Sequence, residues 1–101
     1  MRVVIAGAGS VGRSIARELL RNEHHVLLVD RDADAERVQK VPEASWLQAD
    51  ACEIEALGEA GLADCDVVVA ATGDDKVNLV LSLLAKTEFG VPRTVARVNN
   101  P

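Results

Sequence analysis

The feature that most constrains the fold is the stretch VVIAGAGSVGRSIARELL at residues 3–20. It runs from a β-branched apolar segment, through three glycines spaced G-x-G-x-x-G, into a segment whose apolar residues recur at helical spacing. A glycine turn between a strand and a helix is typical of a loop that binds phosphate groups. The first N–H groups and the positive end of the helix dipole face the anion there. The stretch therefore predicts a strand, a phosphate-binding turn and a helix.

Each glycine has its own physical reason to lack a side chain. Gly7 allows the tight turn after the strand, and Gly9 lets the backbone approach a pyrophosphate with no Cβ in the way. Gly12 lets the helix pack closely on the strand. The spacing therefore predicts that the three glycines together form the phosphate-binding turn.

The rest of the chain alternates between β-type and helical patterns. The expected strands are residues 2–6, 26–29, 45–49, 66–71 and 94–98, and the expected helices are 11–22, 32–40, 52–60 and 76–89. Strands that alternate with helices through short connections form a parallel sheet with helices on both faces. The pattern predicts an α/β fold, a Rossmann-like doubly wound parallel sheet of about five strands in a three-layer αβα arrangement.

A chain of 101 residues is short enough for one domain, so we expect residues 1–101 to form a single nucleotide-binding unit. A six-stranded dinucleotide fold would need one more helix and strand after Asn100. Either the chain is trimmed at its C-terminus or a partner chain supplies what is missing, and the sequence leaves both alternatives open.

A carboxylate follows the second expected strand, where a Rossmann fold binds ribose. Asp30 lies about 20 residues beyond the glycine turn, and a carboxylate there accepts hydrogen bonds from both ribose hydroxyls. Its charge would repel a 2′-phosphate, which disfavours NADP. Arg31 weakens that inference, because an arginine at this place accommodates the extra phosphate in some folds.

Further candidates follow from the topology, because the ligand of an open α/β sheet lies beyond the carboxyl ends of the strands. Asp50 is expected either to accept from the adenine amino group or to cap the next helix. Arg97 is expected either to reach a phosphate or to form an ordinary surface ion pair. The candidates on this rim are Asp50, Ala51, Ala71, Thr72, Gly73, Arg97 and Asn99.

Composition and charge exclude several classes of function. The 11 Lys and Arg against 16 Asp and Glu give a formal net charge of −5, which argues against a nucleic-acid groove. No apolar run approaches the roughly 20 residues of a membrane span, and no signal-peptide pattern opens the chain, so we expect a cytoplasmic protein. Cys52 and Cys65 lie far apart with no metal-ligand spacing, which predicts reduced thiols and no metal site.

Four further motifs accompany the glycine turn: LLVDRD at 27–32, DA at 50–51, ATGDD at 71–75 and ARVNN at 96–100. In combination they resemble the nucleotide-binding N-terminal lobe of the bacterial Trk/Ktr-type potassium uptake regulators, the RCK or TrkA-N domains, over essentially the whole chain. The resemblance implies a regulatory subunit without catalytic chemistry that binds NAD, NADH, ADP or ATP. It also implies a homo-oligomer, a dimer or a ring of dimers, on the cytoplasmic face of a membrane potassium transporter subunit that it gates by a change of ring shape.

The resemblance also implies roles for single residues. Gly7, Gly9, Ser10, Val11 and Gly12 match the phosphate turn, Asp30 the ribose carboxylate, Asp50 and Ala51 the adenine side, and Arg97 the basic residue after the last strand. Several Ktr-type relatives have an arginine at the position of Ser10 that reaches the terminal phosphates of ATP. Serine here favours a diphosphate or a dinucleotide over a triphosphate. The family's C-terminal ligand lobe has no counterpart in this chain.

The expected helix at 76–89 is too apolar for a helix that buries a single stripe. Leu79 and Leu83 add apolar surface outside the face defined by Val77, Val80, Leu81 and Leu84. The excess indicates an oligomer contact, or a face that a following segment covers.

Two other classes of function remain open. The chain is alternatively the cofactor-binding half of an NAD-dependent dehydrogenase, or an NADH-responsive redox sensor. An enzyme would need an acid or base from elsewhere, because His24 and His25 precede the second strand and so lie at the opposite end of the sheet. A repressor would need a DNA-binding helix-turn-helix, for which this acidic chain offers no candidate.

Overall fold

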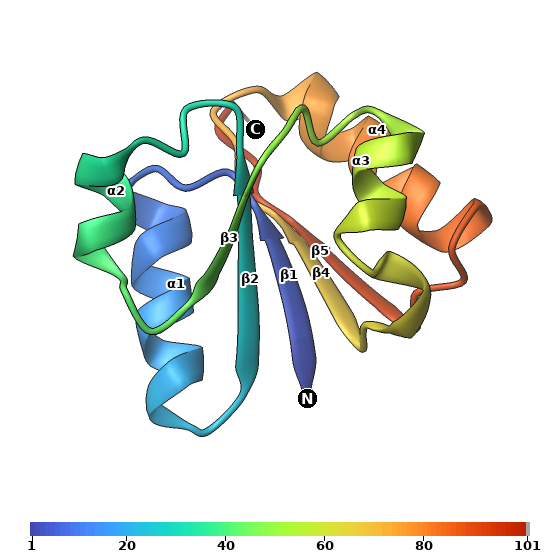
Figure 1. Ribbon diagram of the computed structural model, residues 1–101. Helices are drawn as coiled ribbons and strands as arrows, with labels where there is room; N and C mark the ends of the chain where they lie inside the picture. Colours follow the sequence, from blue (N-terminus) through green and yellow to red (C-terminus); the bar gives the residue numbers. More distant parts are fainter. Residues whose placement is uncertain (101) are drawn as a thin grey trace.

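Strands and helices alternate along the chain as the sequence predicts (Figure 1). The structure, a computed structural model, describes residues 1–100. The strands are β1 (Arg2–Ala6), β2 (His25–Asp30), β3 (Ser45–Gln48), β4 (Val67–Ala70) and β5 (Arg93–Ala96). The helices are α1 (Ser10–Arg21), α2 (Ala35–Lys40), α3 (Ile54–Glu59) and α4 (Asp75–Thr87), with a short 3-10 helix, η1 (Leu62–Asp64).

The strands form one parallel sheet in the order β3-β2-β1-β4-β5. Helices α1 and α2 cover one face, and α3 and α4 cover the other (Figure 1). From β1 the chain proceeds outward to β3, then crosses to β4 and continues in the opposite direction. The predicted Rossmann-like fold is confirmed, and the order reverses between β1 and β4, where the glycine turn leaves the sheet.

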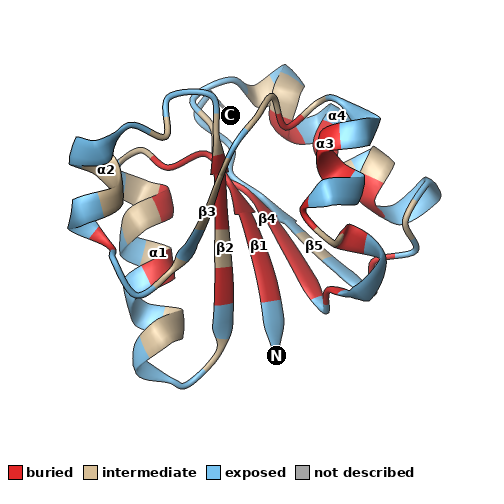
Figure 2. Ribbon diagram, viewed as in Figure 1, coloured by how far each residue is buried: buried red, intermediate tan, exposed pale blue. Residues whose placement is uncertain are grey.

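Apolar side chains fill the space on both faces of the sheet. Ile5 and Leu28 are fully buried on the α1 side, and Val68 and Leu81 lie in the core on the α4 side. Figure 2 shows the buried residues concentrated in the central strands and on the inner sides of the helices. Since full burial of one such side chain contributes roughly 1.5–3 kcal/mol, the two apolar layers hold the carboxyl ends of β1, β2 and β4 in place.

Several boundaries differ from the prediction for local reasons. The pattern places the second helix at 32–40, but it begins at Ala35 because the side chain of Asp34 accepts the N–H of Arg37 and caps it. The third helix begins at Ile54 instead of residue 52. After it, Gly61 adopts φ +77° and leads into η1, which the apolar pattern did not predict.

Helix α4 presents apolar side chains to solvent, as its composition predicts. Leu79 and Leu83 are 61% and 55% exposed. Val80, which the pattern assigns to the packed face, is 44% exposed, and Asn78 is buried instead. We call the surface formed by Leu79, Val80 and Leu83 the α4 outer face.

Candidate functional site

A cleft of about 790 Å³ opens at the carboxyl ends of the strands, beside the reversal of strand order. Its volume and its place match those of ligand sites in open α/β sheets. The residues that line it are Gly7, Gly9, Ser10, Val29, Asp30, Arg31, Asp32, Arg37, Ala49, Asp50, Ala51, Cys52, Ala71, Thr72, Gly73, Asp74, Val77 and Arg97. Most of the residues predicted from the sequence therefore come together here.

The glycine turn has the geometry that its spacing predicts. Gly7 adopts φ +103°, and a Cβ there would lie 2.8 Å from the backbone of Ala71 and Thr72 at the end of β4. A Cβ on Gly12 would lie only 1.9 Å from the carbonyl oxygen of Gly7. These two glycines are therefore required by the fold itself.

Gly9 differs from the other two glycines. Its φ is −73°, which any residue adopts, and apart from Gly9 itself and the adjacent backbone, no heavy atom of residues 1–100 lies within 4 Å of the position its Cβ would take. Gly9 lines the cleft. The packing of the described chain gives no reason for a glycine at this position, whereas close approach by a ligand does.

The N-terminus of α1 is left open toward the cleft. Within the described residues no side chain caps it, and its first turn contains no acidic residue. In contrast, Asp74 caps α4 by accepting the N–H groups of Lys76 and Val77. An uncapped helix of 12 residues presents free N–H groups and the positive end of its dipole, which together favour an anion.

Asp30 lies at the end of β2 and joins the glycine turn to that strand. Its Oδ2 accepts the backbone N–H of Ala8 at 2.7 Å, and its Oδ1 accepts the N–H of Asp32 at 2.7 Å. The side chain is only 15% exposed. These bonds fix the carboxylate at the edge of the cleft, beside the first turn of α1.

Arg37 is a cleft residue that the sequence pattern does not predict. Its Nη1 donates to Oδ2 of Asp30 at 3.2 Å, and the arginine side chain is 32% exposed. Arg37 comes from α2, whose start the pattern placed three residues too early. A basic residue seven positions after Asp30 was the available signal, but its reach depends on how α2 folds back over β2.

Asp50 and Arg31 face each other across the adjoining part of the cleft. Oδ1 of Asp50 accepts the N–H of Cys52 at 2.9 Å, while its Oδ2 lies 4.0 Å from Nη1 of Arg31. Asp50 thus braces the turn before α3, although Glu53 is the N-cap residue. Burial, and then the charges of Asp50 and Asp74, raise the pKa of the Cys52 thiol, which disfavours its thiolate.

A buried amide organises the other side of the cleft. Oδ1 of Asn78 accepts the N–H and the Oγ1 hydroxyl of Thr72 at 3.0 and 2.6 Å, and its Nδ2 donates to the carbonyl oxygens of Thr72 and Arg97 at 3.1 and 2.9 Å. Asn78 is 1% exposed. This amide, which the apolar pattern of α4 did not reveal, fixes the loops that follow β4 and β5.

Some predicted site residues do not line the cleft. Val11 and Gly12 lie in the first turn of α1 and are not among its lining residues. Asn99 donates from Nδ2 to the carbonyl oxygen of Thr72 and to Oδ1 of Asp75, both at 3.0 Å. Asn99 therefore ties the segment after β5 to the N-terminus of α4.

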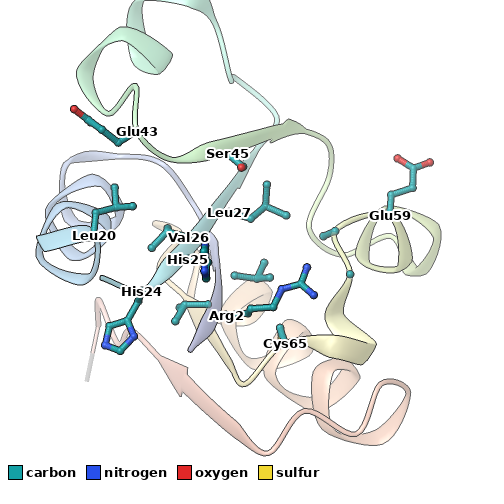
Figure 3. A pocket seen from close by; sticks show the side chains of 14 residues that line it. Arg2, Leu20, His24, His25, Val26, Leu27, Glu43, Ser45, Glu59 and Cys65 are labelled. Carbon is teal, nitrogen blue, oxygen red and sulfur yellow. The ribbon is translucent and has the colours of Figure 1, made fainter. Parts of the chain in front are cut away.

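A second pocket, of about 350 Å³, lies at the amino ends of the strands (Figure 3). Arg2, His24 and His25 contribute to its lining. Both histidines therefore lie at the end of the sheet opposite the cleft, as predicted, although β2 begins one residue earlier than expected and His25 is its first residue. Within residues 1–100, no group of three His, Cys, Asp or Glu side chains is placed to hold a metal ion. No helix in that range is long and apolar enough to cross a membrane.

Comparison with known structures confirms the fold. The GsuK RCK domain is 27% identical, with a TM-score of 0.82, over 96% of this chain and 20% of that one. The C-terminal domain of Shewanella denitrificans Kef, solved in an AMP-bound form, has a TM-score of 0.79 at 24% identity, over 99% of this chain and 60% of that one. The Bordetella bronchiseptica enzyme WbmG in complex with NAD has a TM-score of 0.72 at 22% identity, over 95% of this chain and 36% of that one.

Comparison of sequences identifies the family more specifically than comparison of folds does. The Trk system potassium uptake protein TrkA of Mycobacterium tuberculosis is 59% identical over 101 residues, which cover 100% of this chain and 46% of that protein. The chain thus spans about half the length of this relative. The family model of the TrkA-N domain matches residues 3–101. The chain therefore belongs to the TrkA-N domain family.

Proposed function

We propose that the cleft binds an adenine nucleotide and that the protein is a regulatory subunit of a Trk/Ktr-type potassium uptake system. The main support for nucleotide binding is the uncapped N-terminus of α1. It lies beside Gly9, where a Cβ would point into open space. The glycine leaves room for phosphate oxygens, and the helix start supplies N–H donors.

Each part of a nucleotide has a matching group in the cleft. The turn from Gly7 through Ser10, with Val11 and Gly12 behind it, would hold the phosphates, and Asp30 would accept from the ribose hydroxyls. Asp50 and Ala51 would face the adenine. Thr72, Gly73 and Arg97 would contact the phosphates from the side opposite the glycine turn. Asn99 would support the Thr72 loop from outside the cleft.

The nucleotide is NAD or NADH, or ADP or ATP. The bound AMP of the Kef domain and the NAD of WbmG support the class of ligand, because both contain an adenylate group and both proteins share this fold. Ser10 lacks the charge needed to hold a third phosphate, which favours a diphosphate or a dinucleotide.

Nucleotide state would act on a transporter through the shape of an assembly. A ligand shifts a two-state assembly only by the difference of its affinities for the two states, typically about 1–3 kcal/mol per site. The name of the Mycobacterium relative, a Trk system potassium uptake protein, supports a membrane potassium transporter subunit as the partner. We propose that this domain lies on the cytoplasmic face of that transporter. We infer no catalytic role, since the two histidines of the chain lie at the far end of the sheet.

We further propose that the α4 outer face contacts another protein surface, namely a second copy of the domain. Leu79 and Leu83 lie one helical turn apart, both more than half exposed, and with Val80 they form a single apolar patch. Exposed apolar patches mark interaction sites in soluble domains.

Thermal unfolding of nucleotide-stripped protein with ATP, ADP, NAD, NADH or NADPH tests the nucleotide proposal. A ligand at about 100 times its Kd stabilises the folded state by roughly 2.7 kcal/mol, which raises the Tm of a small domain by on the order of 10 °C. A shift with an adenine nucleotide supports the proposal, and no shift with any of them contradicts it. Hydride transfer from NADH to a substrate would favour the dehydrogenase alternative.

A further inference from the structure

The cleft contains an ion pair at the place where a ribose would be recognised. Arg37 and Asp30 are half-buried, 3.2 Å apart, and both line the cleft. Asp30 is therefore not a free carboxylate, and its partner must take part in any recognition of ribose.

The hydrogen bonds of Asp30 leave little room for a diol. A carboxylate offers about four acceptor positions, two on each oxygen. Oδ2 uses both of its positions, on the N–H of Ala8 and on Arg37, whereas Oδ1 uses one on the N–H of Asp32. One position remains for ribose. A second ribose hydroxyl would have to take the position that Arg37 occupies.

Arg37 hinders a free ribose diol by occupying Asp30, but its positive charge favours a 2′-phosphorylated ribose. A lone Asp30 would repel a 2′-phosphate, but its charge is balanced by a guanidinium at 3.2 Å. Arg31 adds a second guanidinium to the lining of the cleft, 76% exposed and 4.0 Å from Asp50. Two planar donors of this kind match the geometry of phosphate oxygens.

We propose that Arg37 determines how the cleft discriminates between a free ribose diol and a 2′-phosphorylated ribose. It competes with the diol for Oδ2 of Asp30, and it supplies the cation that a 2′-phosphate contacts. The inference rests on the proposed nucleotide site and adds to it a specificity-determining residue. It also modifies the expectation that the charge of Asp30 disfavours NADP.

The test compares two probes that differ only at the 2′-oxygen, AMP and adenosine 2′,5′-bisphosphate, by calorimetric titration of the purified protein. In Arg37→Ala the Kd of the bisphosphate, divided by the Kd of AMP, should rise by at least about tenfold. This is the size expected for the loss of one charge-assisted hydrogen bond. AMP should bind as well as before or more tightly. Arg37→Lys, which keeps the charge, should stay within about threefold of the wild-type ratio.

Arg17→Ala is the matched control, because Arg17 has the same charge, is exposed on α1 and does not line the cleft. Its ratio should equal that of the wild type. Equal weakening of both probes in Arg37→Ala would overturn the inference and leave Arg37 as a brace for Asp30. Failure of the wild type to bind either probe would instead contradict the nucleotide site itself.

Discussion

Asp30 and Ala8 are 22 positions apart in the sequence, and Oδ2 of the first accepts the backbone N–H of the second at 2.7 Å. The bond ties the end of β2 to the glycine turn that follows β1. The carboxylate expected to bind ribose and the loop expected to bind phosphate are thus held as one unit. A change at Asp30 should affect both the fold and the ligand.

Asp30→Ala should weaken nucleotide binding by at least about tenfold, through loss of the acceptor for ribose. It should also lower the free energy of unfolding by about 1–3 kcal/mol, because the N–H of Ala8 loses its partner. Calorimetric titration and urea unfolding measure the two effects. Asp32→Ala makes the same change of charge in the cleft without removing these bonds. It should change neither the nucleotide affinity nor the free energy of unfolding by much. Unchanged affinity in Asp30→Ala would move the ribose site elsewhere.

The glycines of the turn should separate folding from binding. Gly12→Ala places a Cβ against the carbonyl oxygen of Gly7 and should destabilise the fold by more than about 3 kcal/mol. Gly9→Ala meets no described atom and should cost less than about 1 kcal/mol, yet weaken nucleotide binding by about tenfold or more. Thermal unfolding and titration of the two variants check this. Full affinity in a folded Gly9→Ala would show that phosphates do not approach this backbone.

The segment after β5 should respond to acid. Oδ1 of Asp75 accepts the N–H of Asn99 at 2.7 Å and Oδ2 accepts that of Asn100 at 2.9 Å. The hydrogen bonds from Asn99 and Asn100 hold the pKa of Asp75 below its ordinary value of 3.8. Because the folded pKa is the lower one, the stabilisation is full above about pH 5 and is lost as the pH falls through the folded value.

The pH dependence of urea unfolding checks this prediction. The difference in stability between the wild type and Asp75→Asn should be constant near neutral pH and shrink below 3.8. A difference that does not vary with pH would mean that the charge of Asp75 contributes nothing to these bonds.

Substitution on the α4 outer face tests the oligomer contact. Leu79→Lys or Leu83→Lys should lower the mass measured by light scattering to that of the monomer. The free energy of unfolding of the monomer should change by less than about 0.5 kcal/mol, because both side chains are exposed on the single chain. Glu55→Lys on α3 is a surface control with the same new residue. An unchanged mass together with lost stability would show instead that these leucines pack within the protein.

Much of the fold is predictable because β-branched runs and glycine spacing are local signals. The five strands and the parallel topology follow from them, and Gly7 and Gly12 have the conformation and packing that their spacing requires. What the pattern misses depends on tertiary contact. Arg37 reaches Asp30 only through the position of α2, and Asn78 is buried by contacts with two loops.

Asn99 shows the limit of reasoning from topology alone. Its place after β5 suggests the rim of the cleft, but its side chain is used on Thr72 and Asp75. Position at a strand end predicts proximity to the ligand and does not predict the direction of the side chain.

Amide-resolved NMR titration with ADP and with NADH determines whether an adenine nucleotide binds at the glycine turn. Binding at the turn should give the largest shift changes at the N–H groups of Gly9, Ser10 and Val11, with further changes at Thr72 and Gly73. Changes confined to Arg2, His25 and their neighbours in the opposite pocket, or none with either nucleotide, would contradict it.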